Sequence, residues 1–168
     1  VVSNFNQITF FDNLAKRHIY THAYFKIFAW QKIVENLVDQ TACNINYNRP
    51  LLHLAKEAGK ILATDVHVLS DIYDEYNKEF MEYADILFLS DENIGDNYGD
   101  FLWQLAHTYN SQIIVLGRGN KGVAVYQRQT NRIDEMPAIP ITNVVNTVGA
   151  GDALFSAFLH FYAKGCDV

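Results

Sequence analysis

The sequence contains few cysteines and no excess of basic side chains. Its two cysteines, Cys43 and Cys166, lie far apart in 168 residues. This spacing argues against a disulfide scaffold and favours two thiols in a reducing cytosol. There are 13 Lys and Arg against 19 Asp and Glu, which gives a net charge of −6. Such an acidic balance argues against nucleic acid as a partner.

Long apolar runs and a secretion signal are also missing. No run approaches the ~20 apolar residues that a membrane-crossing helix needs. The first ten residues lack a cationic stretch followed by an apolar one, which is the pattern of a signal peptide. We therefore expect no membrane partner and a cytoplasmic location.

The composition favours a well-packed soluble domain, because 49% of the residues are apolar and only 19% are charged. From Arg49 onward, helical and strand patterns alternate, which predicts an α/β domain with a largely parallel sheet. The expected helices cover residues 49–60, 72–84, 99–110 and 153–165, and the expected strands cover 61–69, 85–90, 111–116 and 123–129. A proline-marked connection is expected over 134–145. The first 48 residues give weaker signals, a strand at 1–11 and a helix at 29–40, and stay unassigned.

Helical spacing indicates which apolar side chains share one face in each of two expected helices. In the helix expected over 49–60 they are Leu51, Leu54, Ala55 and Ala58. In the helix expected over 72–84 they are Ile72, Tyr76, Phe80 and either Tyr83 or Ala84.

The first of two glycine-rich segments follows the strand expected at 111–116. Gly117, Gly119 and Gly122 have the spacing G-x-G-x-x-G of a dinucleotide-binding loop. That loop binds pyrophosphate only where a helix begins at the motif. The residues after Gly122 alternate like a strand, so we favour a hairpin connection that borders a nucleotide site. The alternative, a nicotinamide-dependent oxidoreductase, predicts a helix directly after Gly122.

The second glycine-rich segment, residues 146–152, lies between an extended approach at 142–145 and a long apolar helix. Gly149 and Gly151 allow a tight bend that turns several N–H groups toward one point. With the helix dipole behind them, these donors suit a transferring phosphoryl group. Asp152 lies in the first helical turn, where a carboxylate can accept the proton of an attacking hydroxyl. The alternative makes Asp152 a helix cap and the glycines a tight entry.

This segment, with the elements before it, resembles a known family. NTVGAGDALFSAFL is similar to the C-terminal signature of the ribokinase-like (PfkB) carbohydrate kinases, D-T-x-G-A-G-D followed by a small and apolar helix. Over about residues 49–165, the strand with Asp65, the strand that begins Ala84-Asp85 and the strand that ends in Gly117 follow the family's order. The resemblance implies a ribokinase-like three-layer core in one α/β domain over 1–168, with a mostly parallel sheet between helices.

The resemblance also implies an activity. Members of this family are ATP-dependent kinases that transfer the γ-phosphoryl group to a hydroxyl of a sugar or related small metabolite, with ATP and Mg²⁺. Asp152 matches the family's base. The backbone of Gly149, Ala150 and Gly151 matches the segment that holds the phosphate charge.

Four further positions match the nucleotide side of the family's site. Thr147 corresponds to the motif's threonine near the phosphates, next to Asn146. Gly117 and Gly122 correspond to the family's glycine loop.

The sequence departs from the family pattern at several positions. Asn146 replaces an acidic residue. The family's N-x-x-E element falls at Ser90–Asn93, which leaves Asp91, Glu92 and Asn93 as metal candidates. The family's D-x-N-x-R falls at Asp65–Leu69, where the arginine is missing and His67 is a further candidate at the strand end. These departures motivate an alternative function, a catalytically weak or inactive family member that binds nucleotide or sugar in a regulatory role.

No segment before Arg49 matches the substrate loop or the lid strands of the family. We therefore expect the chain to be part of a larger fold, or a shortened relative. The small-molecule substrate can be a sugar, a sugar acid or a nucleoside, and whether the protein forms a homo-oligomer stays open.

Overall fold

The computed structural model describes residues 40–141, 144 and 146–168. The expectations for residues 1–39, and the extended approach expected at 142–145 apart from residue 144, lie outside the described part. The described residues form one six-stranded sheet in the order β1-β2-β3-β4-β5-β6. Strands β1 to β4 are parallel, and β5 and β6 are antiparallel to their neighbours. The strands are β1 (Gln40–Cys43), β2 (Leu62–Val68), β3 (Ile86–Ser90), β4 (Ile113–Gly117), β5 (Val123–Gln127) and β6 (Arg132–Met136).

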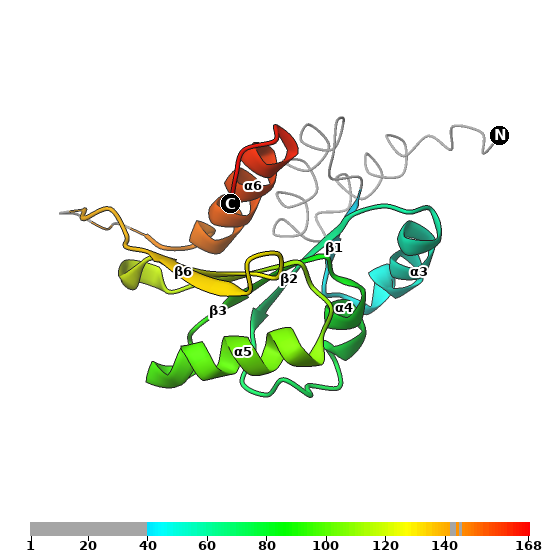
Figure 1. The fold of residues 1–168 in the computed structure, drawn as a ribbon, viewed down its shortest axis with the longest axis horizontal. Helices are drawn as coiled ribbons and strands as arrows, with labels where there is room; N and C mark the ends of the chain where they lie inside the picture. The colour runs from blue at the N-terminus through cyan, green and yellow to red at the C-terminus, as the bar shows by residue number, and fades with distance from the viewer. Residues whose placement is uncertain (1–39, 142–143, 145) are drawn as a thin grey trace.

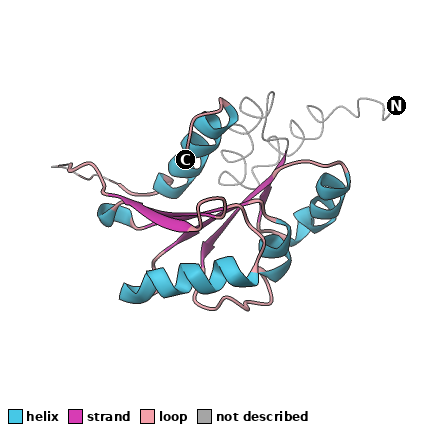
Figure 2. Ribbon diagram, in the orientation of Figure 1, coloured by secondary structure: helices cyan, strands magenta, loops and turns pink. Residues whose placement is uncertain are grey.

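Helices cover both faces of this sheet. The helices are α3 (Arg49–Glu57), α4 (Lys78–Tyr83), α5 (Tyr98–Thr108) and α6 (Ala150–Ala163). Figure 1 shows α3, α4 and α5 on one face and α6 on the other, and Figure 2 shows the sheet between them. This arrangement confirms the expected α/β fold with three layers and a mostly parallel sheet. In the described ranges no helix is long and apolar enough to cross a membrane.

Two apolar layers hold the helices on the sheet. Alternate residues of β3 and β4 point to opposite faces, and both faces are buried, as parallel strands between helices require. One layer joins Leu87, Leu89, Ile114 and Leu116 to Phe80, Leu102 and Leu105. The other joins Ile86, Phe88, Ile113 and Val115 to Leu159 of α6.

The expected apolar face of the first helix is partly wrong. In α3, Leu52 and Ala55 are buried, whereas Leu51 and Leu54 are 50% and 59% exposed. Leu52 and Ala55 pack in the core, which places Leu51 and Leu54 on the solvent-facing side of the helix. Arg49 contacts Glu79 of α4 at 2.7 Å, and Lys56 contacts Asp85 at 2.6 Å.

The helix expected over 72–84 is also shorter than its apolar spacing indicated. Only α4, residues Lys78–Tyr83, is helical. The side chains of Asp71 and Asp74 accept the backbone N–H groups of Tyr73 and Asn77 at 2.8 and 2.7 Å. Such local side-chain bonds stabilise turns in competition with the helix. Residues 71–77 therefore form turns, although Ile72 is still buried.

Strand β6 differs from the sequence-based expectation, which places residues 134–136 in a connection and gives residues 132–133 no element. The strand contains three charged side chains, and Ile133 is its residue that packs against the core. An edge strand with little apolar alternation gives almost no periodic signal.

Asp85 joins the amino ends of three strands. Its carboxylate accepts the N–H of Leu62 at 2.7 Å, in addition to the Lys56 ammonium. Its backbone oxygen accepts the N–H of Gln112 at 2.7 Å, just before β4. This residue therefore fixes the start of β2, β3 and β4 relative to one another.

The hairpin between β4 and β5 is confirmed, because β5 pairs antiparallel with β4 directly after Gly122. Because a strand and not a helix follows Gly122, the G-x-G-x-x-G segment is not a dinucleotide-binding loop, and the oxidoreductase alternative is wrong. Gly122 has φ +102°, and a Cβ there would clash with Met136 O and lie 2.7 Å from the nitrogen of Ala138. The close approach of the chain leaving β6 thus requires a glycine at this position.

Replacing Gly122 by alanine is expected to destabilise the protein by more than about 3 kcal/mol, because strain from the positive φ adds to a backbone clash. Gly119→Ala is the matched control. Gly119 also has a positive φ, but a Cβ added there would meet no atom within 4 Å. That variant is expected to lose only about 1 kcal/mol. Urea denaturation measures both, and equal losses would contradict the close-approach explanation.

Candidate functional site

The glycine-rich segment before α6 forms a tight turn into the helix. The side-chain oxygen of Asn146 accepts the N–H of Val148 at 2.9 Å, and Thr147 O accepts the N–H of Ala150 at 3.0 Å. Gly149 is the N-cap, with a left-handed φ of +82°. Asn146 thus supplies the hydrogen bond that an aspartate would supply at this position, without the charge.

Aromatic packing fixes where this turn lies on the sheet. The ring of Phe88 in β3 makes edge-on contacts with Phe155 and Phe158 of α6, with centroid distances of 4.8 and 5.2 Å. One turn earlier, Leu154 lies over Gly117, where a Cβ would be 3.7 Å from Leu154 Cδ2. The start of α6 therefore lies over the carboxyl ends of β3 and β4, the edge where parallel α/β sheets bind ligands.

Asp152 and Gly151 lie in the first turn of α6. Asp152 is half-buried. Gly151 is exposed, has an ordinary φ, and has open space within 4 Å of where a Cβ would lie. Alanine would fit this position and would favour the helix by up to ~1 kcal/mol. The fold of the described residues gives no reason for a glycine here.

The end of β3 lies beside the same turn. Ser90 pairs in register with Gly117, and the N–H of Asp91 donates to Gly117 O at 3.0 Å. Asp91 is half-buried, whereas Glu92 and Asn93 are exposed. Within the described ranges no group of three His, Cys, Asp or Glu could hold a metal ion by itself. A single carboxylate still fits Mg²⁺, which proteins often bind through one or two carboxylates together with substrate phosphates.

The end of β2 is irregular. The register with β3 shifts between Asp65 and Val68, and His67 has a left-handed φ of +60°. The Asp65 carboxylate accepts the N–H of His67 at 2.8 Å, which stabilises this bulge. Both side chains thus lie at the carboxyl end of a parallel strand, as expected for His67.

The structure adds one group at this edge that no sequence pattern indicated. The Arg118 guanidinium lies 3.7 Å from the centre of the Tyr98 ring, and Glu135 accepts hydrogen bonds from Arg118 at 2.9 Å and from Tyr98 at 2.5 Å. The pKa of the Glu135 carboxyl is lowered mainly by the hydrogen bond from Tyr98 and next by the hydrogen bond from Arg118. The hydrogen bond to Glu135 raises the pKa of the Tyr98 hydroxyl. The three residues come from the end of β4, the start of α5 and β6, so no local motif joins them. They fix the loop that follows Gly117.

Known proteins share this sequence pattern and fold. The model of the pfkB family carbohydrate kinases matches residues 6–168. A cytidine kinase from Thermococcus kodakarensis is 36% identical over 64 residues, which cover 37% of this chain and 22% of that protein. The solved structure of a microbiome-derived acarbose kinase is 29% identical, with a TM-score of 0.67 over 76% of this chain and 43% of the other.

A nucleoside kinase from Methanocaldococcus jannaschii, described as an archaeal member of the ribokinase family, is 26% identical, with a TM-score of 0.52 over 69% of this chain and 40% of the other. The chain thus spans less than half the length of these relatives. The family match covers nearly every residue, and the described fold agrees with it. The chain therefore belongs to the pfkB family of carbohydrate kinases.

Proposed function

We propose that the protein is an ATP-dependent kinase that transfers the γ-phosphoryl group to a hydroxyl of a sugar or nucleoside. The observation that carries this proposal is Gly151, a helical glycine that the fold does not require, next to Asp152 at the carboxyl edge of the sheet. A glycine without a structural reason is typical of a position where a ligand approaches the backbone closely. The cytidine kinase and acarbose kinase relatives support a small-molecule acceptor.

The chemistry follows from the start of α6. The N–H groups of Gly149 and Gly151, with the helix dipole, stabilise the charge on the transferring phosphoryl group, whereas the N–H of Ala150 donates to Thr147 O within the turn. The acceptor hydroxyl oxygen attacks phosphorus while its proton passes to the Asp152 carboxylate. The bond to the bridging oxygen breaks, and ADP leaves. The product is the phosphorylated acceptor.

The nucleotide side of the site comes from two loops. Thr147 and Asn146 lie in the turn before α6, and Gly117 lies beneath Leu154. The close approach of the chain that leaves β6 accounts for the glycine at position 122. We therefore expect the loop of Gly122 to contact the nucleotide through its backbone groups. When bound, Mg²⁺ neutralises the phosphate charge. Asp91 is the carboxylate we assign to it, with Glu92 and Asn93 beside it.

Replacing Gly151 by alanine is expected to move stability and activity in opposite directions. The variant gains about 0.5–1 kcal/mol of folding stability from helix propensity. It loses at least about tenfold in kcat, because the added methyl group lies where the phosphoryl group approaches. Thermal unfolding and a coupled ADP-release assay with sugars and nucleosides measure the two effects on the full-length protein.

Gly99→Ala in α5 is the matched control, because Gly99 also has an ordinary φ and open space within 4 Å of where a Cβ would lie. It is expected to raise stability and leave kcat unchanged. If Gly151→Ala behaves in the same way, a close approach of the ligand to Gly151 is wrong.

Replacing Asp152 by asparagine is expected to lower kcat by about 10²–10⁴-fold, because the amide cannot accept the hydroxyl proton. Binding of a non-hydrolysable ATP analogue, measured by calorimetry, is expected to change little. An unchanged rate would remove Asp152 as the base. A wild-type protein that binds the analogue but transfers no phosphoryl group to any acceptor would instead support the regulatory alternative.

A further inference from the structure

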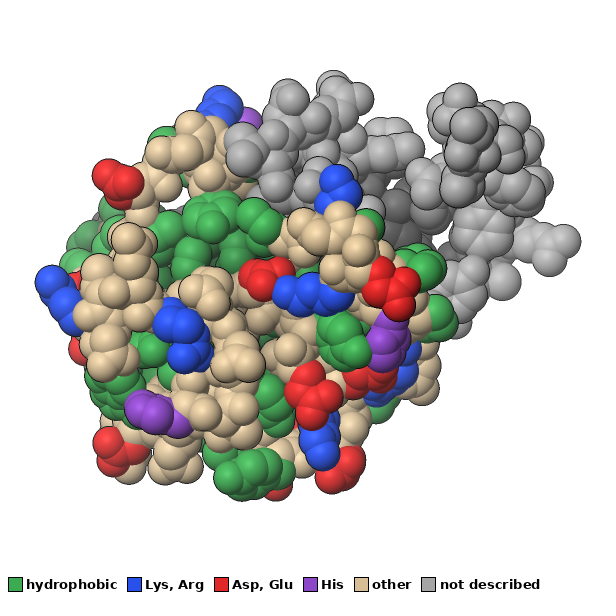
Figure 3. Space-filling model, turned by 45° about the vertical axis from the view of Figure 1, so that its right-hand side comes forward, with side chains coloured by type: hydrophobic (Ala, Val, Ile, Leu, Met, Phe, Trp, Pro, Cys, Tyr) green, Lys and Arg blue, Asp and Glu red, His purple; other side chains and the backbone are tan. Residues whose placement is uncertain are grey.

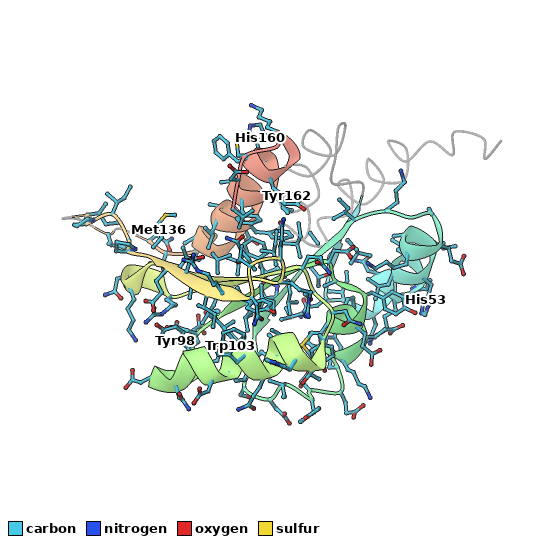
Figure 4. The ribbon with its side chains drawn as sticks, viewed as in Figure 1. His53, Tyr98, Trp103, Met136, His160 and Tyr162 are labelled. Atoms are coloured by element: carbon cyan, nitrogen blue, oxygen red, sulfur yellow. The ribbon has the colours of Figure 1, made fainter. Side chains whose placement is uncertain are left out.

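A second cluster of reactive side chains lies on α3 and α4, away from the start of α6. Tyr83 and His53 Nδ1 are 2.7 Å apart, and His53 Nε2 lies 2.9 Å from one oxygen of Glu79. The other oxygen of Glu79 accepts a hydrogen bond from Arg49 at 2.7 Å. We call Tyr83, His53, Glu79 and Arg49 the α3–α4 relay. Figure 4 shows His53 on α3, across the sheet from Tyr162 and His160 of α6.

The hydrogen bonds determine the tautomer of neutral His53. An ionised carboxylate only accepts hydrogen bonds, so Nε2 must carry the proton that His53 donates to Glu79. Nδ1 then has a free electron pair and accepts the hydroxyl proton of Tyr83. This is the order of groups in an activated nucleophile, with a hydroxyl, a base and a carboxylate that orients the base.

Arg49 keeps the carboxylate of the relay ionised and in place. Its hydrogen bond is the main cause that lowers the pKa of Glu79. The same guanidinium lies 4.6 Å from the centre of the buried Phe80 ring and donates to the Tyr76 backbone oxygen at 2.5 Å. An arginine held by three contacts keeps Glu79 pointed at His53 and positions it to stabilise an imidazolium.

The relay is open to solvent. The His53 side chain is 52% exposed and Tyr83 is half-buried. On the face seen in Figure 3, acidic and basic side chains gather at the right. The phosphoryl transfer proposed above uses none of these residues.

We propose that Tyr83 is a nucleophilic modification site, with His53 as its base, that accepts acyl or sulfonyl groups from activated small-molecule electrophiles. With an arylsulfonyl fluoride, the Tyr83 oxygen attacks sulfur and the O–S bond forms. The S–F bond breaks and fluoride leaves. The phenolic proton passes to His53 Nδ1, where Glu79 stabilises the imidazolium, and then to water.

Two other tyrosines allow the effect of the relay on the labelling rate to be distinguished from the effect of solvent exposure. Tyr73 is 64% exposed, more than the half-buried Tyr83. The hydroxyl of Tyr76 donates to the backbone oxygen of Asn44 at 2.8 Å, an acceptor that is a weak base. Exposure alone therefore predicts that Tyr73 reacts first, whereas the relay predicts that Tyr83 does.

The test is time-resolved labelling of the full-length protein with an arylsulfonyl fluoride at neutral pH, followed by peptide mass spectrometry. Tyr83 is expected to react at least about tenfold faster than Tyr73, a conservative bound below the ~10²-fold that general-base assistance typically supplies. His53→Phe keeps a ring at that position and is expected to reduce labelling of Tyr83 to the Tyr73 rate. Glu79→Gln is expected to slow labelling of Tyr83 as well.

Glu57→Gln is the matched control, because it removes an exposed carboxylate from the same helix as His53. It is expected to leave the ratio of Tyr83 to Tyr73 labelling unchanged. Faster labelling of Tyr73 in the wild type, or an unchanged Tyr83 rate in both His53→Phe and Glu79→Gln, overturns the proposal. If His53→Phe does not fold, the wild-type ratio and Glu79→Gln decide the outcome.

Discussion

The contact between Phe88 of β3 and the two phenylalanines of α6 is the constraint on which the proposed active site depends. It holds the middle of α6 on the sheet, so the first turn of α6 lies over the last residues of β3 and β4. Leu154 lies over Gly117 at that point. The position of Asp152 is therefore a result of core packing, made by residues that carry no chemistry.

The amino ends and the carboxyl ends of the strands differ in the regularity of their backbone. At the amino ends, Asp85 satisfies backbone groups of neighbouring strands and pairs with Lys56. At the carboxyl ends there is a bulge, a left-handed histidine and exposed glycines instead. Irregular backbone at this edge is consistent with a binding role, because ligands of parallel sheets approach there.

The sequence predicted most of the sheet, because β2, β3 and β4 are apolar on both faces and are bounded by polar or glycine residues. It also placed the glycine turn at the start of α6. It missed β1, which lies within the unassigned first 48 residues, and β6, whose charged residues show no alternation. It assigned too many residues to α4, because Asp71 and Asp74 stabilise turns despite the helical spacing of Ile72. The group formed by Arg118, Tyr98 and Glu135 could not be predicted, since its members are distant in sequence and meet only in the folded sheet.

The close approach at Gly122 has a consequence for how the fold accommodates insertions. The chain that leaves β6 passes directly over the β4–β5 hairpin and then leads to the turn before α6. Additional residues in that hairpin would therefore displace the segment that leaves β6. The loop of residues 69–77 before α4 is constrained in another way, because Leu69 and Ile72 are buried and Ile72 O accepts the hydroxyl of Tyr109 at 2.7 Å.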